Sequence, residues 1–209
     1  MNKILFSSLF FKIVPNFKRL FVVGLLVFLG MMLNLSVIAQ KTWDGGAFTA
    51  NWGDANNWNP NGVPASTDAV TLVGGQSVIV NINNAVCASL TLSPTGSGTA
   101  AVSFIASSQL TVSGVVSLGN AGNNNRVGSI NMTNGGKLIC GGFALGNAGS
   151  NIFTPGSGSV EITTTSTLPA TVFTTFNILK IAGGTTTLGR VITVDTLEIG
   201  SGATLTPGT

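Results

Sequence analysis

The chain has 209 residues, of which only 7% are charged, and it contains neither histidine nor tyrosine. Without histidine it cannot build the Ser-His-Asp or Cys-His arrangements that activate a serine or cysteine nucleophile. The formal net charge of +3 is misleading, because four of the nine basic residues fall within the first 19 positions. The remaining lysines and arginines form no cluster that could neutralise phosphates, so the sequence excludes a nucleic-acid-binding protein.

Residues 1–39 have the order of a secretory signal peptide. Basic residues precede an apolar run over 20–33, and the segment ends in the small residue Ala39, with Val37 two positions before it. The run is shorter than the ~20 residues of a membrane-spanning helix, which is the alternative interpretation. We therefore predict cleavage after Ala39, membrane contact through this peptide alone, and a secreted or outer cell-surface location.

The chain from residue 69 onward consists of short runs in which apolar and polar residues alternate, separated by Gly, Asn, Ser and Pro. Such alternation is typical of β-strands, and pairs such as Gly74-Gly75 and Asn83-Asn84 mark turns. The residues that favour surface helices are scarce. The pattern predicts an all-β fold.

An internal repeat indicates how these strands are arranged. The motif at 118–122, Leu-Gly-Asn-Ala-Gly, returns 27 residues later at 145–149, and the stretch 128–132 is echoed 30 residues later at 158–162. A period of this length, with about three strands in each repeat, is typical of stacked coils. We predict a right-handed parallel β-helix, a solenoid, over 69–209, and expect a truncated C-terminus because the last repeat stops part-way. A Greek-key β-sandwich is the alternative.

Two cysteines, Cys87 and Cys140, are 53 positions apart, or about two repeats. Two coils separate stacked positions by ~9.6 Å, which exceeds the ~7 Å limit between the Cα atoms of bridged cysteines. Alternation also places Cys140 on the same face as Leu138, but Cys87 on the face opposite to Leu90 and Leu92. Two free thiols are therefore predicted.

The segment 40–68 precedes the predicted coils and is rich in tryptophan and acidic residues. We interpret it as an N-terminal cap, in which large rings cover the first coil and neighbouring Asn and Asp side chains accept hydrogen bonds from the indole N–H groups. The alternative is a carbohydrate-binding module that stacks sugars on exposed tryptophan faces. The candidate cap or ligand residues are Trp43, Trp52, Trp58, Asp44 and Asp54.

Metal binding is not the favoured interpretation of this segment. The run that starts at Asp54 places Trp58 where an EF-hand loop needs its third oxygen ligand. A looser calcium site with Asp44, Asp54 or Asp68 is the alternative to solvated turns. The sequence thus predicts no metal site and no cofactor.

Catalytic carboxylates are also hard to find. Glycoside hydrolysis needs two of them about 5–10 Å apart, and Asp195 and Glu198 are close in sequence, but alternation points Glu198 away from Leu197 and Ile199. Between residues 69 and 125 the chain has no charge at all. We therefore predict a protein that is not an enzyme.

Two stretches resemble a known class of protein. The segment 43–70 reads W-D-G-G, N-W, N-W, G-x-P and D-x-V in that order, which is similar to the start of β-helical, autotransporter-like surface proteins of Gram-negative bacteria. Many of these are exported by the type IX secretion pathway. The late tract 176–205 resembles their repeats. Together the stretches cover about a third of the chain after residue 39, which has no recognisable C-terminal sorting domain.

These features together predict a secreted or cell-surface structural and adhesive protein, which acts as a non-catalytic display or spacer platform. Its partners would be glycans or other cell-surface molecules. The alternative is the N-terminal part of a polysaccharide-degrading β-helix enzyme whose active groove lies further along the protein.

Overall fold

A computed structural model describes residues 39–146, 151–169 and 171–208 of the chain. The predicted signal peptide therefore lies outside the described residues, except for Ala39, and so does most of the second copy of the repeated motif. The structure is all-β, as predicted, with 53% of residues in strands, 2% in helix, and parallel sheets. Within the described ranges, no helix is long and apolar enough to cross a membrane.

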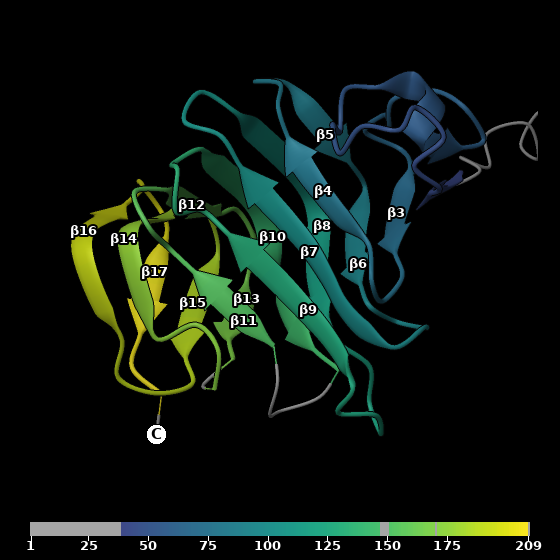
Figure 1. The fold of residues 1–209 in the computed structure, drawn as a ribbon. Helices are drawn as coiled ribbons and strands as arrows, with labels where there is room; N and C mark the ends of the chain where they lie inside the picture. The colour runs from purple at the N-terminus through teal and green to yellow at the C-terminus, as the bar shows by residue number, and fades with distance from the viewer. Residues whose placement is uncertain (1–38, 147–150, 170, 209) are drawn as a thin grey trace, which may run out of the picture. The chain divides into compact units, whose positions relative to one another are not determined.

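The elements follow one another as short strands with a single turn of 3-10 helix (Figure 1). In chain order they are β1 (Gln40–Trp43), η1 (Ala55–Asn57), β2 (Trp58–Asn59), β3 (Ala69–Leu72), β4 (Ser77–Val80), β5 (Ala85–Cys87), β6 (Ser89–Leu92), β7 (Gly98–Phe104), β8 (Gln109–Leu118), β9 (Arg126–Asn131), β10 (Lys137–Leu145), β11 (Ile152–Thr154), β12 (Ser159–Ile162), β13 (Ser166–Leu168), β14 (Thr175–Ile181), β15 (Thr185–Leu188), β16 (Thr193–Ile199) and β17 (Thr204–Thr206).

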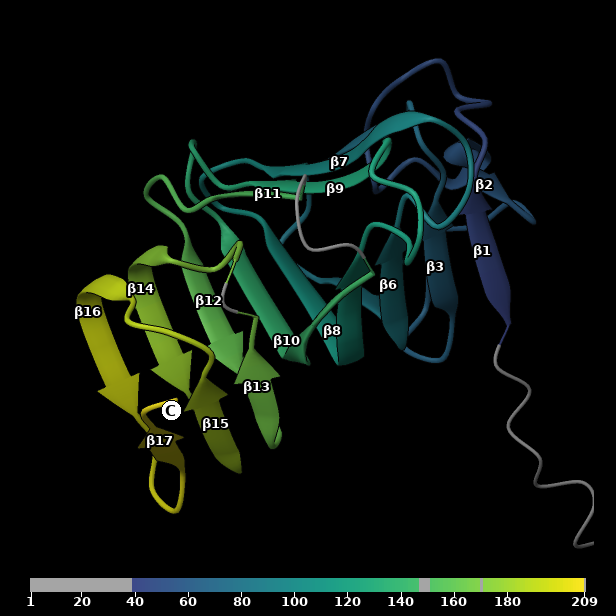
Figure 2. The ribbon, with the colours of Figure 1, turned by 90° about the horizontal axis from the view of Figure 1, so that it is seen from below.

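Three sheets contain these strands (Figure 2). The largest has the order β16-β14-β12-β10-β8-β6-β3-β1-β2, with β5 paired to β8; a second has β11-β9-β7-β4, and a third β13-β15-β17. Among the described strands, every pair except β1 with β2 is parallel. A Greek-key sandwich needs antiparallel neighbours, so that alternative is wrong.

The parallel register places apolar residues of successive strands next to one another. One such row runs across the largest sheet and consists of Cys87, Val112, Cys140, Ile162 and Ile181. Each of these side chains is at most 1% exposed. Since burying an aliphatic side chain of this size contributes about 1.5–3 kcal/mol, rows of this kind form the core.

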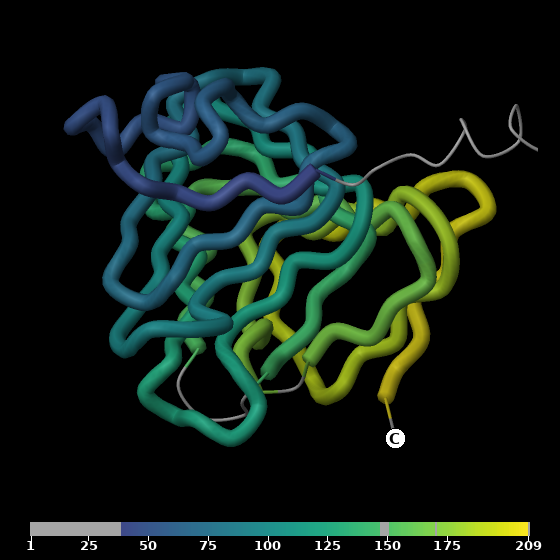
Figure 3. Tube along the Cα trace, turned by 90° about the vertical axis from the view of Figure 1, so that its right-hand side faces the viewer, coloured from purple at the N-terminus to yellow at the C-terminus, as the bar shows by residue number. Residues whose placement is uncertain are grey.

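The interval between neighbouring strands changes along the chain (Figure 3). Hydrogen bonds link Ser113 to Ala88, 25 residues apart, but Asn177 to Gly158, only 19 apart. The second sheet ends at β11, so later passes of the chain bridge two sheets instead of three and need fewer residues. The predicted period in the high twenties is therefore correct for the middle of the chain and wrong for its C-terminal part.

The two sequence echoes differ in meaning. Leu118 pairs directly with Leu145, so the repeated motif at 118–122 begins at equivalent positions of two adjacent strands. The stretches 128–132 and 158–162 do not stack, because β9 and β12 belong to different sheets. Their similarity reflects a shared strand pattern.

Both cysteines are free, as predicted. Cys87 and Cys140 pair with Val112 from opposite sides, so one strand lies between them. The predicted orientation of Cys87 is wrong, however, because its side chain is buried with the core. Strand β5 ends at Cys87 and β6 begins at Ser89, so Ala88 interrupts the alternation that the prediction extended through this point.

We predict that neither thiol of the native chain reacts with a thiol reagent at neutral pH. Burial raises the pKa of both cysteines to about 12, with the nearby Asp68 carboxylate adding to the effect at Cys87, and the thiolate is the reactive form. After denaturation without reductant, both thiols should titrate. A denatured chain that shows no reactive thiol would contradict the register.

Candidate functional site

The three tryptophans form one buried cluster at the end of the largest sheet. Trp52 and Trp58 are 0% exposed and Trp43 is 8% exposed. The rings of Trp43 and Trp52 each meet Trp58 edge to face, with centroids 5.0 and 4.8 Å apart. No ring face of the cluster is therefore open for a sugar to stack on, so the sugar-stacking alternative has no basis in this arrangement.

The indole N–H groups are satisfied differently from the prediction. Trp58 donates from Nε1 to the backbone carbonyl of Trp52, at 2.9 Å, whereas the predicted partners were Asn and Asp side chains. The Nε1 of Trp52 is buried without a partner among the described residues. The buried Asn57 side chain instead supports the surrounding loop, accepting from the Ala47 N–H and donating to the Asn51 carbonyl.

The segment that carries these rings reaches the outermost strands of two sheets. Strand β1 pairs with β3 in the largest sheet. The Trp52 N–H donates to the carbonyl of Ile79 on β4, which is the outermost strand of the second sheet. Main-chain hydrogen bonds therefore tie the tryptophan cluster to both sheets at one end.

The carboxylates of the segment serve separate local turns. Asp44 accepts from the Gly46 N–H and Asp68 from the Ala65 N–H, at 3.0 and 2.9 Å. Asp54 accepts from the side chains of Thr49 and Asn51. In the described part of the chain, no three Asp, Glu, Cys or His side chains gather where they could hold a metal ion, so the calcium alternative gains no support.

A row of alternating charges crosses the outer face of the largest sheet. Glu161 pairs with Lys180, and Lys180 pairs with Glu198, on β12, β14 and β16. Lys137, on β10, extends to Glu161 with its Nζ 2.7 Å from Oε2, and the Nζ of Lys180 lies 3.5 Å from the same oxygen. The parallel register thus brings together four charges that are far apart in sequence.

Glu161 is the electrostatic centre of this charge row, which consists of Lys137, Glu161, Lys180 and Glu198. Partial burial raises its pKa, but the hydrogen bond and charge of Lys137, together with Lys180, outweigh burial and hold the pKa below the usual glutamate value. A general acid for glycoside hydrolysis needs a raised pKa. The carboxyl of Glu161 is shifted in the opposite direction, which favours a structural ion pair.

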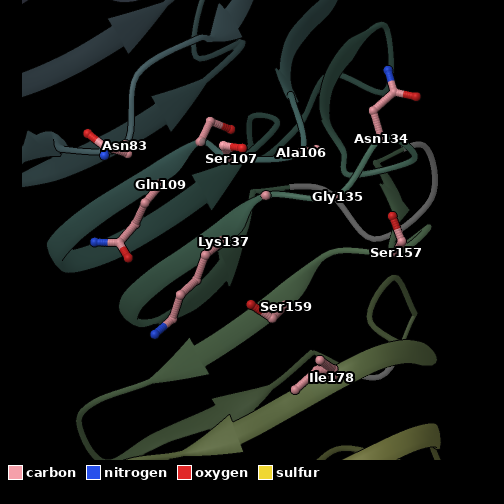
Figure 4. Close-up of a pocket in the computed structure, with 12 residues that line it drawn as sticks. Asn83, Ala106, Ser107, Gln109, Asn134, Gly135, Lys137, Ser157, Ser159 and Ile178 are labelled. Carbon is pink, nitrogen blue, oxygen red and sulfur yellow. The ribbon is translucent and has the colours of Figure 1, made fainter.

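Beside the charge row lies a polar groove with a cavity of ≈ 570 Å³. Figure 4 shows Gln109, Lys137, Ser159 and Ile178 on its wall, following one another from strand to strand. A second cavity, of ≈ 190 Å³, shares the last three of these residues and extends along the charge row. The polar side chains of the larger groove are Asn83, Ser107, Ser108, Gln109, Asn134, Lys137, Ser157 and Ser159.

The floor of the groove depends on close backbone packing. Gly136 has a φ of +83°, and a Cβ there would meet the Cβ of Phe104 at 2.7 Å. The turn before β10 can therefore approach the preceding turn only with glycine at this position. Ser108 fixes that preceding turn by donating to the Ile105 carbonyl at 2.8 Å.

The structure does not bring the predicted candidate residues together with this groove. Trp43, Trp52, Trp58, Asp44 and Asp54 all belong to the N-terminal segment. Asp195 and Glu198 are both exposed on β16, where Glu198 ends the charge row. The sequence analysis did not find the row or the groove, and outward positions on strands of known register were the signal needed to find them.

Comparisons with known proteins identify no relative: no family model, curated protein or solved structure matches the chain.

Replacing Trp58 with alanine should destabilise the fold by about 3–5 kcal/mol, the usual cost of removing a fully buried aromatic ring. The change is read from the midpoint of urea unfolding. Phe48→Ala is the matched control, because Phe48 lies in the same segment but is 98% exposed, and it should shift stability by less than about 0.5 kcal/mol. Equal effects of the two changes would refute the role of the cluster.

Stability should fall as the pH drops through the lowered pKa of Glu161. A depressed carboxyl pKa stabilises the fold above the ordinary glutamate value and loses that effect as the group is protonated. Glu161→Gln should therefore cost about 0.5–1 kcal/mol at pH 7 and almost nothing in strong acid. Urea unfolding across this pH range measures the difference.

Glu198→Gln is the control for this experiment. Glu198 lies in the same row but forms no ion pair within the described residues. The effect of its replacement on stability should be smaller at neutral pH than that of Glu161→Gln. The ion-pair assignment is wrong if the two changes cannot be told apart.

Proposed function

We propose that the protein is a secreted or cell-surface structural and adhesive protein, which acts as a display or spacer platform without catalysis of its own. The described strands are proposed to wind as a right-handed parallel β-helix, with residues 40–68 as its N-terminal cap and residues 69–209 as its coils. The observation that carries the proposal is the continuous parallel register, which joins strands from one end of the described chain to the other.

The architecture is supported by the rows of side chains on both faces of the largest sheet. A chain that returns to the same sheet every 18 to 28 residues and pairs in parallel each time buries its apolar rows against themselves. The N-terminal segment pairs with the outermost strands of two sheets, which favours a cap, since open strand edges invite aggregation.

A passive role is supported by the chemistry of the surface. The carboxylates of the N-terminal segment accept hydrogen bonds in their own turns. Glu161 is held ionised between two lysines. These groups are engaged in holding the structure, whereas a catalytic acid or base needs a carboxyl poised to exchange a proton.

The location is supported by sequence alone. The order of charge and hydropathy in residues 1–39 is that of a signal peptide, and the tryptophan-rich pattern of 43–70 resembles exported β-helical surface proteins. A stack built mainly of neutral polar and apolar residues also suits a rigid element that projects from a surface.

Surface labelling tests this proposal. An epitope tag inserted in the exposed turn at Ser201-Gly202, where no neighbouring atom lies within 4 Å of a Cβ on Gly202, should leave the fold intact. Antibody should label intact Gram-negative cells that express the tagged full-length chain, or recover the chain from the medium. Detection after lysis alone would contradict the proposal.

A chain with the basic residues of its first 19 positions replaced by glutamate serves as the control. It should remain inside the cell if residues 1–39 direct export. Equal labelling of both chains would show that another segment is responsible.

A further inference from the structure

We propose that the polar groove beside the charge row binds a neutral, linear polysaccharide, which lies across the strands from one chain pass to the next. The inference rests on the proposed display function and names the class of ligand that such a surface would hold. It depends on three properties of the groove: the chemistry of its side chains, its repeat distance and its rigidity.

The side chains that line the groove match sugar hydroxyls. Serine hydroxyls and the amides of Asn83, Gln109 and Asn134 each donate and accept hydrogen bonds, and a sugar hydroxyl does the same. Lys137 is the charged residue of the lining, and its ammonium group already lies 2.7 Å from the Glu161 carboxylate. The groove therefore carries little free charge and favours an uncharged ligand.

The repeat distance of the groove suits a chain of sugar rings. Its lining comes from five successive passes of the backbone, beginning at Asn83 and ending at Ile178. Neighbouring passes are joined by main-chain hydrogen bonds, such as Gln109 N–H to Ile82 and Ser159 N–H to Gly136. Neighbouring strands lie ~4.8 Å apart, so the groove extends roughly 19 Å. One strand spacing is close to the length of one pyranose unit in an extended polysaccharide.

The groove is also rigid before any ligand arrives. Its outward side chains stand on strands whose alternate residues, such as Leu110 and Leu138, are buried in the core. The turns that form its floor are fixed by Ser108 and by the close packing at Gly136. Preorganised polar groups lose little freedom on binding, which favours affinity for a ligand held mainly by hydrogen bonds.

Other surfaces of the described chain fit a glycan less well. The tryptophan rings, which would be the usual stacking platform, are buried. The charge row would attract ions or charged groups. The groove is the surface where a cavity, neutral polar side chains and a regular spacing coincide.

Titration of the purified full-length chain with neutral oligosaccharides tests the inference. β-1,4-linked glucose and mannose series, from disaccharide to hexasaccharide, are the probes, and a galacturonate hexasaccharide is the acidic comparison. Affinity for at least one neutral series should increase with length up to about five sugars, because each added ring reaches another strand. High salt should change it less than twofold, because the binding groups are uncharged.

A pair of double variants locates the binding site. Gln109→Ala with Ser159→Ala should weaken binding about tenfold, as expected for losing hydrogen bonds to two polar side chains. Thr91→Ala with Ser117→Ala removes a similar pair of outward polar groups from β6 and β8, away from the groove. This control should bind within twofold of the unaltered chain.

Three results would overturn the inference: no binding to either neutral series, binding to the galacturonate probe alone with strong salt dependence, or equal binding by the two double variants. Loss of this inference would leave surface labelling unchanged. Failure of surface labelling would overturn the display function even if the groove bound sugars.

Discussion

Main-chain hydrogen bonding between parallel strands is the constraint on which the rest of this structure depends. It decides which side chains become neighbours, because each strand repeats the in-and-out order of the strand beside it. A shift of one residue would move a whole apolar set to the outer face. The buried row that contains Cys87, Val112 and Cys140 and the outer row of Lys137, Glu161 and Lys180 are consequences of the same register.

This constraint also explains the unusual composition. In a parallel stack, each outward residue lies beside its counterpart on the next strand, so like charges would repel along the whole row. Neutral Thr, Ser and Asn avoid that repulsion. Where charges do occur on the largest sheet, their signs alternate, as at Glu161, Lys180 and Glu198. The same neutral surface provides the groove for which we propose a glycan ligand.

Local reasoning succeeded where the pattern extended over a strand and failed at interruptions. Leu110 and Val112 are buried as the alternation indicates, but Cys87 is buried as well, because Ala88 separates two strands that the pattern joined. The indole of Trp58 donates to a backbone carbonyl, which no side-chain pattern encodes. Stretches 128–132 and 158–162 look alike because they serve as strands, yet they occupy different sheets.

The sequence by itself determined the all-β class, the inward residues of most strands and the free state of the thiols, because side-chain alternation is a local property of an extended backbone. The tertiary structure alone decided which strands are neighbours. That depends on how many residues each turn uses, and the interval falls from 25 residues at Ser113 to 19 at Asn177. The charge row, the groove and the burial of the tryptophans follow from these pairings, so no local pattern could have located them.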